Sequence, residues 1–189
     1  MSREPDHRGS ILIAIAREQL TNRLLDTPLS DLQATWGGEG WLFEPGAVFI
    51  TLRHHGTLRG CVGSLEAVRP LIEDVRYNAI AAATRDTRFP PLDQQELGDV
   101  RIEVSLLSPP EPLQFDNEAD ALAQLRPGDD GVVLQHGARR STFLPQVWDT
   151  LPERQDFVAQ LKKKAGLAPD FWDEDIRLER YGVEKWCEA

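Results

Sequence analysis

The segment that most constrains how this chain can fold is GAVFITLRHHGTLRGCVGSL, residues 46–65. Apolar residues alternate with other residues over 46–53, which is the period of a strand with one buried face. A tight hairpin turn needs positive φ, which glycine adopts freely and histidine tolerates, so His54-His55-Gly56 is predicted as the turn. Residues 57–62 then return as a second strand. The pattern predicts a β-hairpin.

The returning strand contains the motif LRGCVG, with a cysteine between two glycines. Glycine weakens a strand, so Gly60 and Gly63 indicate a β-bulge or a surface where something approaches the backbone closely. Arg59 and Cys61 are two residues apart, and such residues project from the same face of a regular strand. We therefore expect the candidate site of this protein at LRGCVG.

Length and composition limit the class of protein. The chain has 189 residues, and 41% of them are hydrophobic, which is enough for one domain over residues 1–189. The longest apolar runs are well short of the ~20 residues that span a bilayer, and the apolar piece at 11–16 is too short for a signal peptide. We expect a cytoplasmic protein without membrane contact. A formal net charge of −10 argues against nucleic acid as the main partner.

The two cysteines, Cys61 and Cys187, do not form a metal-ligand pattern. They are too few to hold an iron–sulfur cluster within the chain. We therefore expect no metal and no cofactor in this chain. A disulfide between them is disfavoured in a reducing cytoplasm.

The remaining elements follow in two similar series. In the first half we expect a helix over 10–25, a connection over 26–45 held down by aromatic residues, a helix over 70–84, a loop RDTRFPPL at 85–92 and a strand over 100–107. In the second half we expect a helix over 116–125, a hairpin over 131–143 with a turn at His136-Gly137, a helix from about 151 to 165 and a strand over 176–186. Each half is a hairpin, a helix and a strand, which predicts a duplication of 46–107 and 131–186.

The duplication predicts pairs of equivalent residues. When Gly56 is set against Gly137, Arg59 matches Arg140 and Cys61 matches Thr142. A pseudo-twofold axis would then bring these four side chains together. Because a planar guanidinium suits carboxylate or phosphate groups, the two arginines are candidates for anion binding.

The chemistry of LRGCVG has two interpretations. Cys61 is either a nucleophile, with nearby arginines lowering the pKa of its thiol, or a small buried residue of a tight strand. Arg59 and Arg140 either bind a ligand together with Gly60 and Thr142, or pair with acidic residues across the sheet.

Three other groups of residues have either a functional or a structural interpretation. Arg88 of the 85–92 loop forms either an anion clamp or part of a structural lid. Glu103 faces either a cleft or solvent, and the solvent interpretation is favoured. The histidines at 54, 55 and 136 could supply a base, but forming the turns is the stronger interpretation.

Six sequence blocks resemble one known family. They are LRGCVGSLEAVRPL, RDTRFPPL, IEVSLLSPPEPL, LRPGDDGVVL, STFLPQVW and KKKAGL, in this order over about residues 11–184. The chain thus resembles the AMME-chromosomal-region protein family, whose prokaryotic members are called AmmeMemoRadiSam system protein A. The family pattern does not require the histidines, because relatives often carry Asn-Gly where this chain has His55-Gly56.

The resemblance implies an α+β fold. Duplicated β-hairpin–helix–strand units would form an antiparallel sheet or barrel-like core flanked by helices, with a smaller subdomain packed against it. It also implies association with radical-SAM and Memo-type proteins, although the family's biochemical activity is not established. Two hypotheses follow: an enzyme or enzyme component with a cleft around Cys61 that binds an anionic small molecule or a modified side chain, or a non-catalytic adaptor in which LRGCVG is structural.

Overall fold

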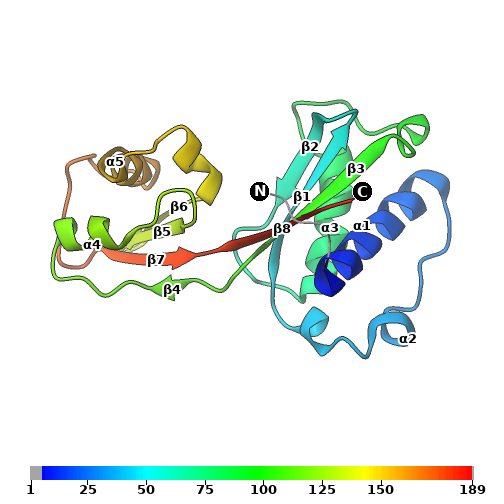
Figure 1. The fold of residues 1–189 in the computed structure, drawn as a ribbon, viewed down its shortest axis with the longest axis horizontal. Coiled ribbons are helices and arrows are strands. Elements are labelled where there is room, and N and C mark those ends of the chain that lie inside the picture. Colours follow the sequence, from blue (N-terminus) through cyan, green and yellow to red (C-terminus); the bar gives the residue numbers. More distant parts are fainter. Residues whose placement is uncertain (1–5, 189) are drawn as a thin grey trace. The chain divides into compact units, whose positions relative to one another are not determined.

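The computed structural model describes residues 6–188. Within this range the chain contains five α-helices and two four-stranded antiparallel sheets, which confirms the α+β class (Figure 1). The chain forms two compact units. The first comprises the residues up to Leu107 together with the segment from Glu184, and the second comprises Ser108–Val183. The prediction of a single domain with two related halves stays a prediction.

The first unit is built on the sheet β2-β1-β3-β8. Its strands are β1 (Ala47–His54), β2 (Thr57–Gly63), β3 (Val100–Leu107) and β8 (Val183–Cys187). The predicted hairpin is confirmed, with His55 at φ 49° and Gly56 at φ 80° in the turn. Figure 1 shows β1 between its hairpin partner β2 and β3.

Two helices cover one face of this sheet. They are α1 (His7–Leu25) and α3 (Leu71–Thr84). Alternate residues of the strands, such as Ile50 and Ile102, are fully buried against apolar residues of both helices. Because strand side chains alternate between faces, the residues between them point to the opposite face of the sheet.

A buried carboxylate joins α3 to the hairpin. Asp74 is fully buried, and its oxygens accept hydrogen bonds from the Val48 backbone N–H (2.9 Å), the Ser64 hydroxyl (2.7 Å) and the Asn78 amide (3.0 Å). The Arg69 Nε lies 3.4 Å from the same carboxylate. A buried charge is tolerated only when it is paired and hydrogen-bonded, so this network fixes how α3 meets β1.

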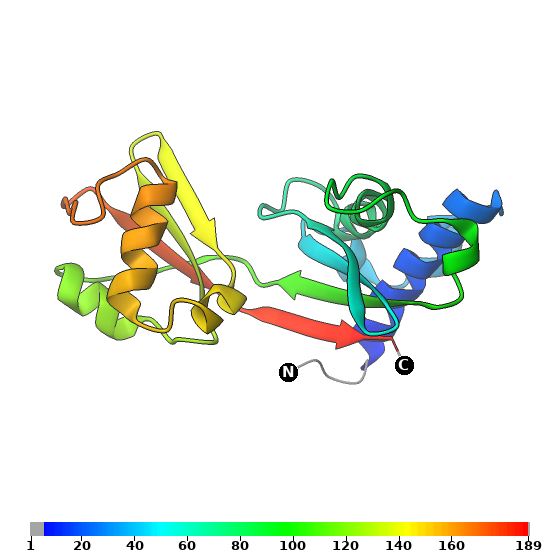
Figure 2. The same ribbon diagram turned by 90° about the horizontal axis from the view of Figure 1, so that it is seen from above.

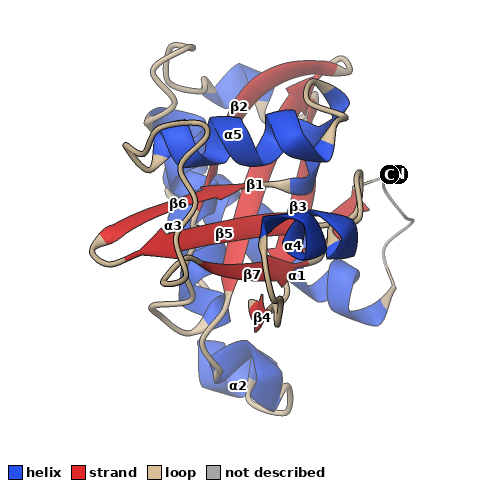
Figure 3. Cartoon of the chain, turned by 90° about the vertical axis from the view of Figure 1, so that its left-hand side faces the viewer, coloured by secondary structure: helices blue, strands red, loops and turns tan. Residues whose placement is uncertain are grey.

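The second unit is built on the sheet β4-β7-β5-β6. Its strands are β4 (Glu111–Pro112), β5 (Gly131–His136), β6 (Arg139–Phe143) and β7 (Arg177–Tyr181). Figure 3 shows β6, β5 and β7 side by side. The helices α4 (Glu118–Gln124) and α5 (Arg154–Lys164) lie with this sheet in the second unit (Figure 2). They share a core with it, in which Phe157 stacks on Trp148.

Several predicted boundaries were wrong. The helix predicted at 10 begins at His7, because the Asp6 side chain accepts a hydrogen bond from the Gly9 N–H and caps it. The connection over 26–45 contains a short helix, α2 (Leu32–Trp36), and a 3-10 turn, η1 (Gly40–Phe43). The strand predicted over 176–186 is two strands, β7 and β8, because the strand is interrupted at Gly182.

The break at Gly182 gives the two sheets corresponding strand orders. In each, the hairpin's first strand lies between its partner and the strand that follows the next long helix. The fourth strand of each sheet comes from the segment that follows the third strand of the other: β4 follows β3 but pairs with β7, and β8 follows β7 but joins β3. None of the described helices is long and apolar enough to cross a membrane.

We expect Asp74→Ala to lower the free energy of unfolding by about 3 kcal/mol, because it leaves the buried Val48 N–H without its acceptor and removes one acceptor of the buried Asn78 amide. The measurement is urea unfolding followed by circular dichroism. Glu73→Ala is the matched control, since Glu73 is the exposed acidic neighbour in the same first turn. Equal effects of the two substitutions would contradict this role of Asp74.

Candidate functional site

The LRGCVG strand contains the predicted bulge. Leu58 pairs with Arg53 and Gly60 pairs with Leu52, so Arg59 is an extra residue without a partner on β1. A bulge breaks the regular alternation of side chains and redirects the bulged residue. Their spacing of two residues therefore does not place Arg59 and Cys61 on the same face of the sheet, as it would in a regular strand.

The two glycines of the motif are explained by packing inside the first unit. A Cβ on Gly60 would overlap the backbone carbonyl of Ala82 in α3, and a Cβ on Gly63 would overlap the ring of Phe49. The groups that approach the backbone of these two glycines are thus α3 and the Phe49 ring of the same unit. Whether Gly60 also contacts a ligand stays a prediction.

The guanidinium of Arg59 is occupied by a loop of the same unit. Nε and Nη2 donate to the two carboxylate oxygens of Glu96 at 2.7 and 2.8 Å. Nη1 donates to the Pro90 carbonyl at 2.9 Å, and Nη2 donates to the Pro91 carbonyl at 3.3 Å. Four hydrogen bonds use most of the five N–H groups of the side chain, and this favours the structural interpretation of Arg59.

The Arg59–Glu96 pair also changes the acidity of its members. The hydrogen bond from Arg59 lowers the pKa of Glu96 to about 2, with a smaller contribution from the Asp93 backbone N–H. In turn, the hydrogen bond with Glu96 raises the pKa of Arg59. Glu96 lies in the short turn η2 (Gln94–Glu96), where its carboxylate also completes a capping box with Asp93.

A second pair lies at the backbone of Cys61. The Cys61 N–H donates to Asp86 Oδ2 at 2.8 Å, and the same carboxylate receives Nε and Nη2 of Arg88 at 2.9 and 2.6 Å. The Arg88 hydrogen bond holds the pKa of Asp86 far below its usual value, helped by the Cys61 N–H. Asp86 raises the pKa of Arg88, and the Cys61 thiolate adds a small contribution. The Arg88 guanidinium and the Cys61 backbone N–H therefore meet at the same carboxylate oxygen of Asp86.

The side chain of Cys61 belongs to the face of the sheet opposite the helices. Cys61 pairs with Thr51, and Thr51 pairs with Glu103, so the three residues form a row across β2, β1 and β3. The Thr51 hydroxyl donates to the Cys61 sulfur at 3.2 Å. Cys61 is partly exposed, unlike Ile50 and Leu52 on the other face.

Glu103 is buried at 5% exposure, so the favoured interpretation that it faces solvent was wrong. Lys185 of β8 lies 2.9 Å from one of its oxygens, and Arg53 lies 3.9 Å from the other. These cations compensate the buried carboxylate. Cys187 is close by, and the pKa of its thiol is raised by burial and then by the charge of Glu103. Both cysteines are free thiols.

The corresponding hairpin of the second unit differs at the turn. Only Gly137 takes positive φ, at 57°, and His136 ends β5, so the predicted His136-Gly137 turn is in fact Gly137-Ala138. Counted from the turn, the position of Arg140 corresponds to Leu58, because Arg59 is the bulged residue. The proposed match of Arg59 with Arg140 was therefore wrong.

The match of Cys61 with Thr142 survives this correction. Each pairs with the residue three positions before the end of the hairpin's first strand, Thr51 in one case and Val133 in the other. Beyond Arg59 the extra residue of the bulge compensates for the one-residue shift of the turn, so the two hairpins are again in register. The Thr142 hydroxyl lies 3.1 Å from the hydroxyl of Tyr181, and burial raises the pKa of that phenol. Because Arg140 and Thr142 belong to the second unit, a site shared with Cys61 stays a prediction.

The histidines do not provide a base for Cys61. His54 is three residues further along β1 than Thr51, roughly 10 Å at the rise of a strand, which exceeds hydrogen-bond reach. His136 lies 3.5 Å from Asp173 in the second unit. Among residues 6–188, one group that could hold a metal is His54, His55 and Asp99, at the turn end of the first hairpin.

Two residues of this neighbourhood were missed from the sequence. Asp86 carries a local signal, since the Arg88 N–H donates to it at 3.2 Å in an Asp-initiated turn, which DTR in a proline-rich loop indicates. Lys185 carries no such signal, because only the pairing of β8 with β3 brings it to Glu103. A groove of about 320 Å³ in the second unit, between α4 and α5, contains none of the predicted residues.

Several archaeal proteins are similar to this chain. A protein of Methanothermobacter thermautotrophicus is 44% identical over 143 residues, covering 72% of each chain. One of Thermococcus onnurineus is 35% identical and covers 97% of this chain and 92% of its own. The crystal structure of the uncharacterised protein PH0010 from Pyrococcus horikoshii superposes with a TM-score of 0.76 at 30% identity, covering 98% of this chain and 94% of that one.

The family model named AMMECR1 matches residues 13–186, which include parts of both units. This match agrees with the resemblance carried by the six sequence blocks. The chain therefore belongs to the AMMECR1 family.

Proposed function

We propose that this protein binds a small anionic molecule, or a modified side chain, at Cys61 and uses the thiol as its reactive group. The observation that carries the proposal is the environment of the thiol. Cys61 is partly exposed on the face away from the core and receives a hydrogen bond from Thr51, and its backbone N–H shares one oxygen of Asp86 with the guanidinium of Arg88. A thiol beside a cation suits an electrophile that carries a carboxylate or phosphate.

Arg88 replaces Arg59 as the anion-binding residue in this proposal. The N–H groups of Arg59 donate to Glu96 and to two backbone carbonyls. Arg88 is exposed, and only one edge of its guanidinium is hydrogen-bonded to Asp86. Asp86 positions both partners, since it also holds the Cys61 backbone.

Partners belong to the same proposal. The resemblance to AmmeMemoRadiSam system protein A supports action beside radical-SAM and Memo-type proteins, which would hold the cofactor chemistry. This chain would present the anion site and the thiol. We place the protein in the cytoplasm, where reducing conditions keep both thiols free.

The adaptor hypothesis is supported by a different observation. Gly60, Gly63 and Arg59 all have internal structural roles, so most of LRGCVG can be explained without a ligand. In that case the motif would hold the RDTRFPPL loop against β2, and the surface around it would engage a partner protein. The first prediction below separates these hypotheses, and the second tests the structural role of Arg59.

The first prediction compares a charged and a neutral alkylating reagent. We expect the ratio of the Cys61 rate constants for iodoacetate and iodoacetamide to fall about two- to fivefold in Arg88→Gln, because an exposed cation attracts the anionic reagent modestly. Mass spectrometry of the Cys61 peptide measures both rates, and Cys187 serves as an internal reference.

The control for that experiment is Arg23→Gln, which removes the same charge from an exposed position of α1. It should leave the ratio unchanged. A Cys61 thiol that reacts with neither reagent, or a ratio that does not respond to Arg88→Gln, would sink the thiol proposal and favour the adaptor.

The second prediction concerns the structural role of Arg59. Because the folded-state pKa of Glu96 is lowered from 4.5 to about 2, the pair stabilises the fold above pH 4.5, and this stabilisation is lost as the pH falls toward 2. We expect Glu96→Gln to lower the free energy of unfolding by about 1–2 kcal/mol at pH 6, and by less at pH 3. Urea unfolding at both pH values measures the difference.

Glu174→Gln, an exposed glutamate of the second unit, is the control for acid effects on the whole chain. If Glu96→Gln has the same effect at pH 6 and pH 3, the pair does not hold the loop in the way described. Such a result would return Arg59 to the set of residues available for a ligand.

A further inference from the structure

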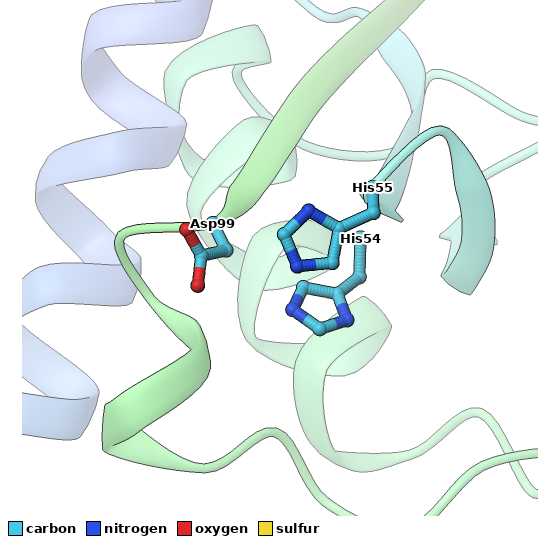
Figure 4. Close-up of side chains that lie close together, drawn as sticks. All are labelled: His54, His55 and Asp99. Atoms are coloured by element: carbon cyan, nitrogen blue, oxygen red, sulfur yellow. The ribbon is translucent and has the colours of Figure 1, made fainter.

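A group of metal-ligating side chains lies at the turn end of the first hairpin, away from the row that contains Cys61. It consists of His54, His55 and Asp99 (Figure 4). One ligand atom of each residue lies within 4.8 Å of the others. Figure 4 shows the two imidazoles next to each other beside the Asp99 carboxylate, and their ring centroids are 4.2 Å apart with the planes tilted by 40°.

The strand register explains why these residues meet. His54 pairs with Val100 across β1 and β3. Because the two strands are antiparallel, His55, which follows His54, and Asp99, which precedes Val100, lie at the same end of the paired strands. The backbone of Asp99 is held further by a hydrogen bond of its N–H to the Glu96 carbonyl at 3.0 Å. The strand pairing and this hydrogen bond therefore fix the backbone positions of the three residues.

The conformation of His55 is a second observation. His55 takes φ 49°, a conformation that glycine and asparagine adopt more readily than histidine. Its side chain is exposed, so core packing does not account for an imidazole at this position. With this backbone conformation the two neighbouring imidazoles lie 4.2 Å apart, so both offer nitrogen atoms to the same region as the Asp99 carboxylate.

We propose that His54, His55 and Asp99 form a binding site for a divalent late transition metal, of which Zn²⁺ is the representative. Two imidazole nitrogens and one carboxylate oxygen are a ligand set that zinc accepts, with water in the remaining position. Tetrahedral zinc needs ligand atoms about 3.3 Å apart, so the side chains have to draw together by at most about 1.5 Å. Partly exposed and exposed side chains can make this movement by small rotations.

The proposed ion would join the hairpin turn to the segment that leads into β3. That segment includes Glu96, which holds Arg59 at the bulge next to Cys61. Metal binding would therefore stabilise the first unit, because an ion that binds only the folded chain shifts the unfolding equilibrium toward it. The site does not depend on the reactivity of Cys61, so it stands or falls separately from the proposed function.

The test is isothermal titration calorimetry of the full chain with Zn²⁺ in a buffer that does not chelate metals. We expect one ion per chain with a dissociation constant in the micromolar range. Asp99→Asn and His55→Asn should each weaken binding by about tenfold or more, since each removes one of three ligands. Asparagine also tolerates positive φ, so His55→Asn preserves the turn, which an unchanged unfolding midpoint without metal verifies.

His136→Gln is the matched control, because His136 also precedes a hairpin turn and lies near a carboxylate. It should bind zinc as the unchanged protein does. Co²⁺ provides an independent readout: ligation by imidazole and carboxylate gives visible d–d bands without a thiolate charge-transfer band. The proposal is overturned by the absence of zinc binding, by full binding in His55→Asn and Asp99→Asn, or by a thiolate band that disappears in Cys61→Ser.

Discussion

The structure of the first unit depends on the buried carboxylate of Asp74. A charge without water is costly, and here it is compensated by the Val48 N–H, the Ser64 hydroxyl and the Asn78 amide. These donors come from the start of β1, from the residue after β2 and from α3 itself. The interaction therefore fixes the helix against the sheet, and the helix can then approach β2 so closely that only glycine fits at position 60.

The closeness of helix and strand gives LRGCVG its form. Gly60 faces the Ala82 carbonyl, the bulge places Arg59 outside the regular ladder, and Glu96 receives its guanidinium. Cys61 is the member of the motif whose side chain turns toward the face away from the core, where Thr51 contacts it. The structural roles of its neighbours thus hold the thiol in place, and the reactive and structural interpretations of the motif are compatible.

The second hairpin has the same pairing with different chemistry. It reaches the Thr142 position without a bulge, because its turn begins one residue later relative to the glycine. Thr142 meets the hydroxyl of Tyr181, whereas Cys61 meets Thr51 and the Asp86–Arg88 pair. If the halves are related, the thiol and its cation are features of the first half alone. Anion binding by two equivalent arginines has therefore lost its basis in the sequence alignment.

The sequence by itself determined the α+β class, the hairpin with its turn at His55-Gly56, the strand over 100–107 and the family. These features depend on local periodicity, turn chemistry and contiguous motifs. Only the tertiary structure decided that Arg59 binds Glu96, that Glu103 is buried beside Lys185 and that β7 and β8 join different sheets. Such contacts join residues far apart in the chain, and a one-residue bulge or a break at one glycine redirects them. Local patterns cannot register those shifts, because they appear only when strands pair.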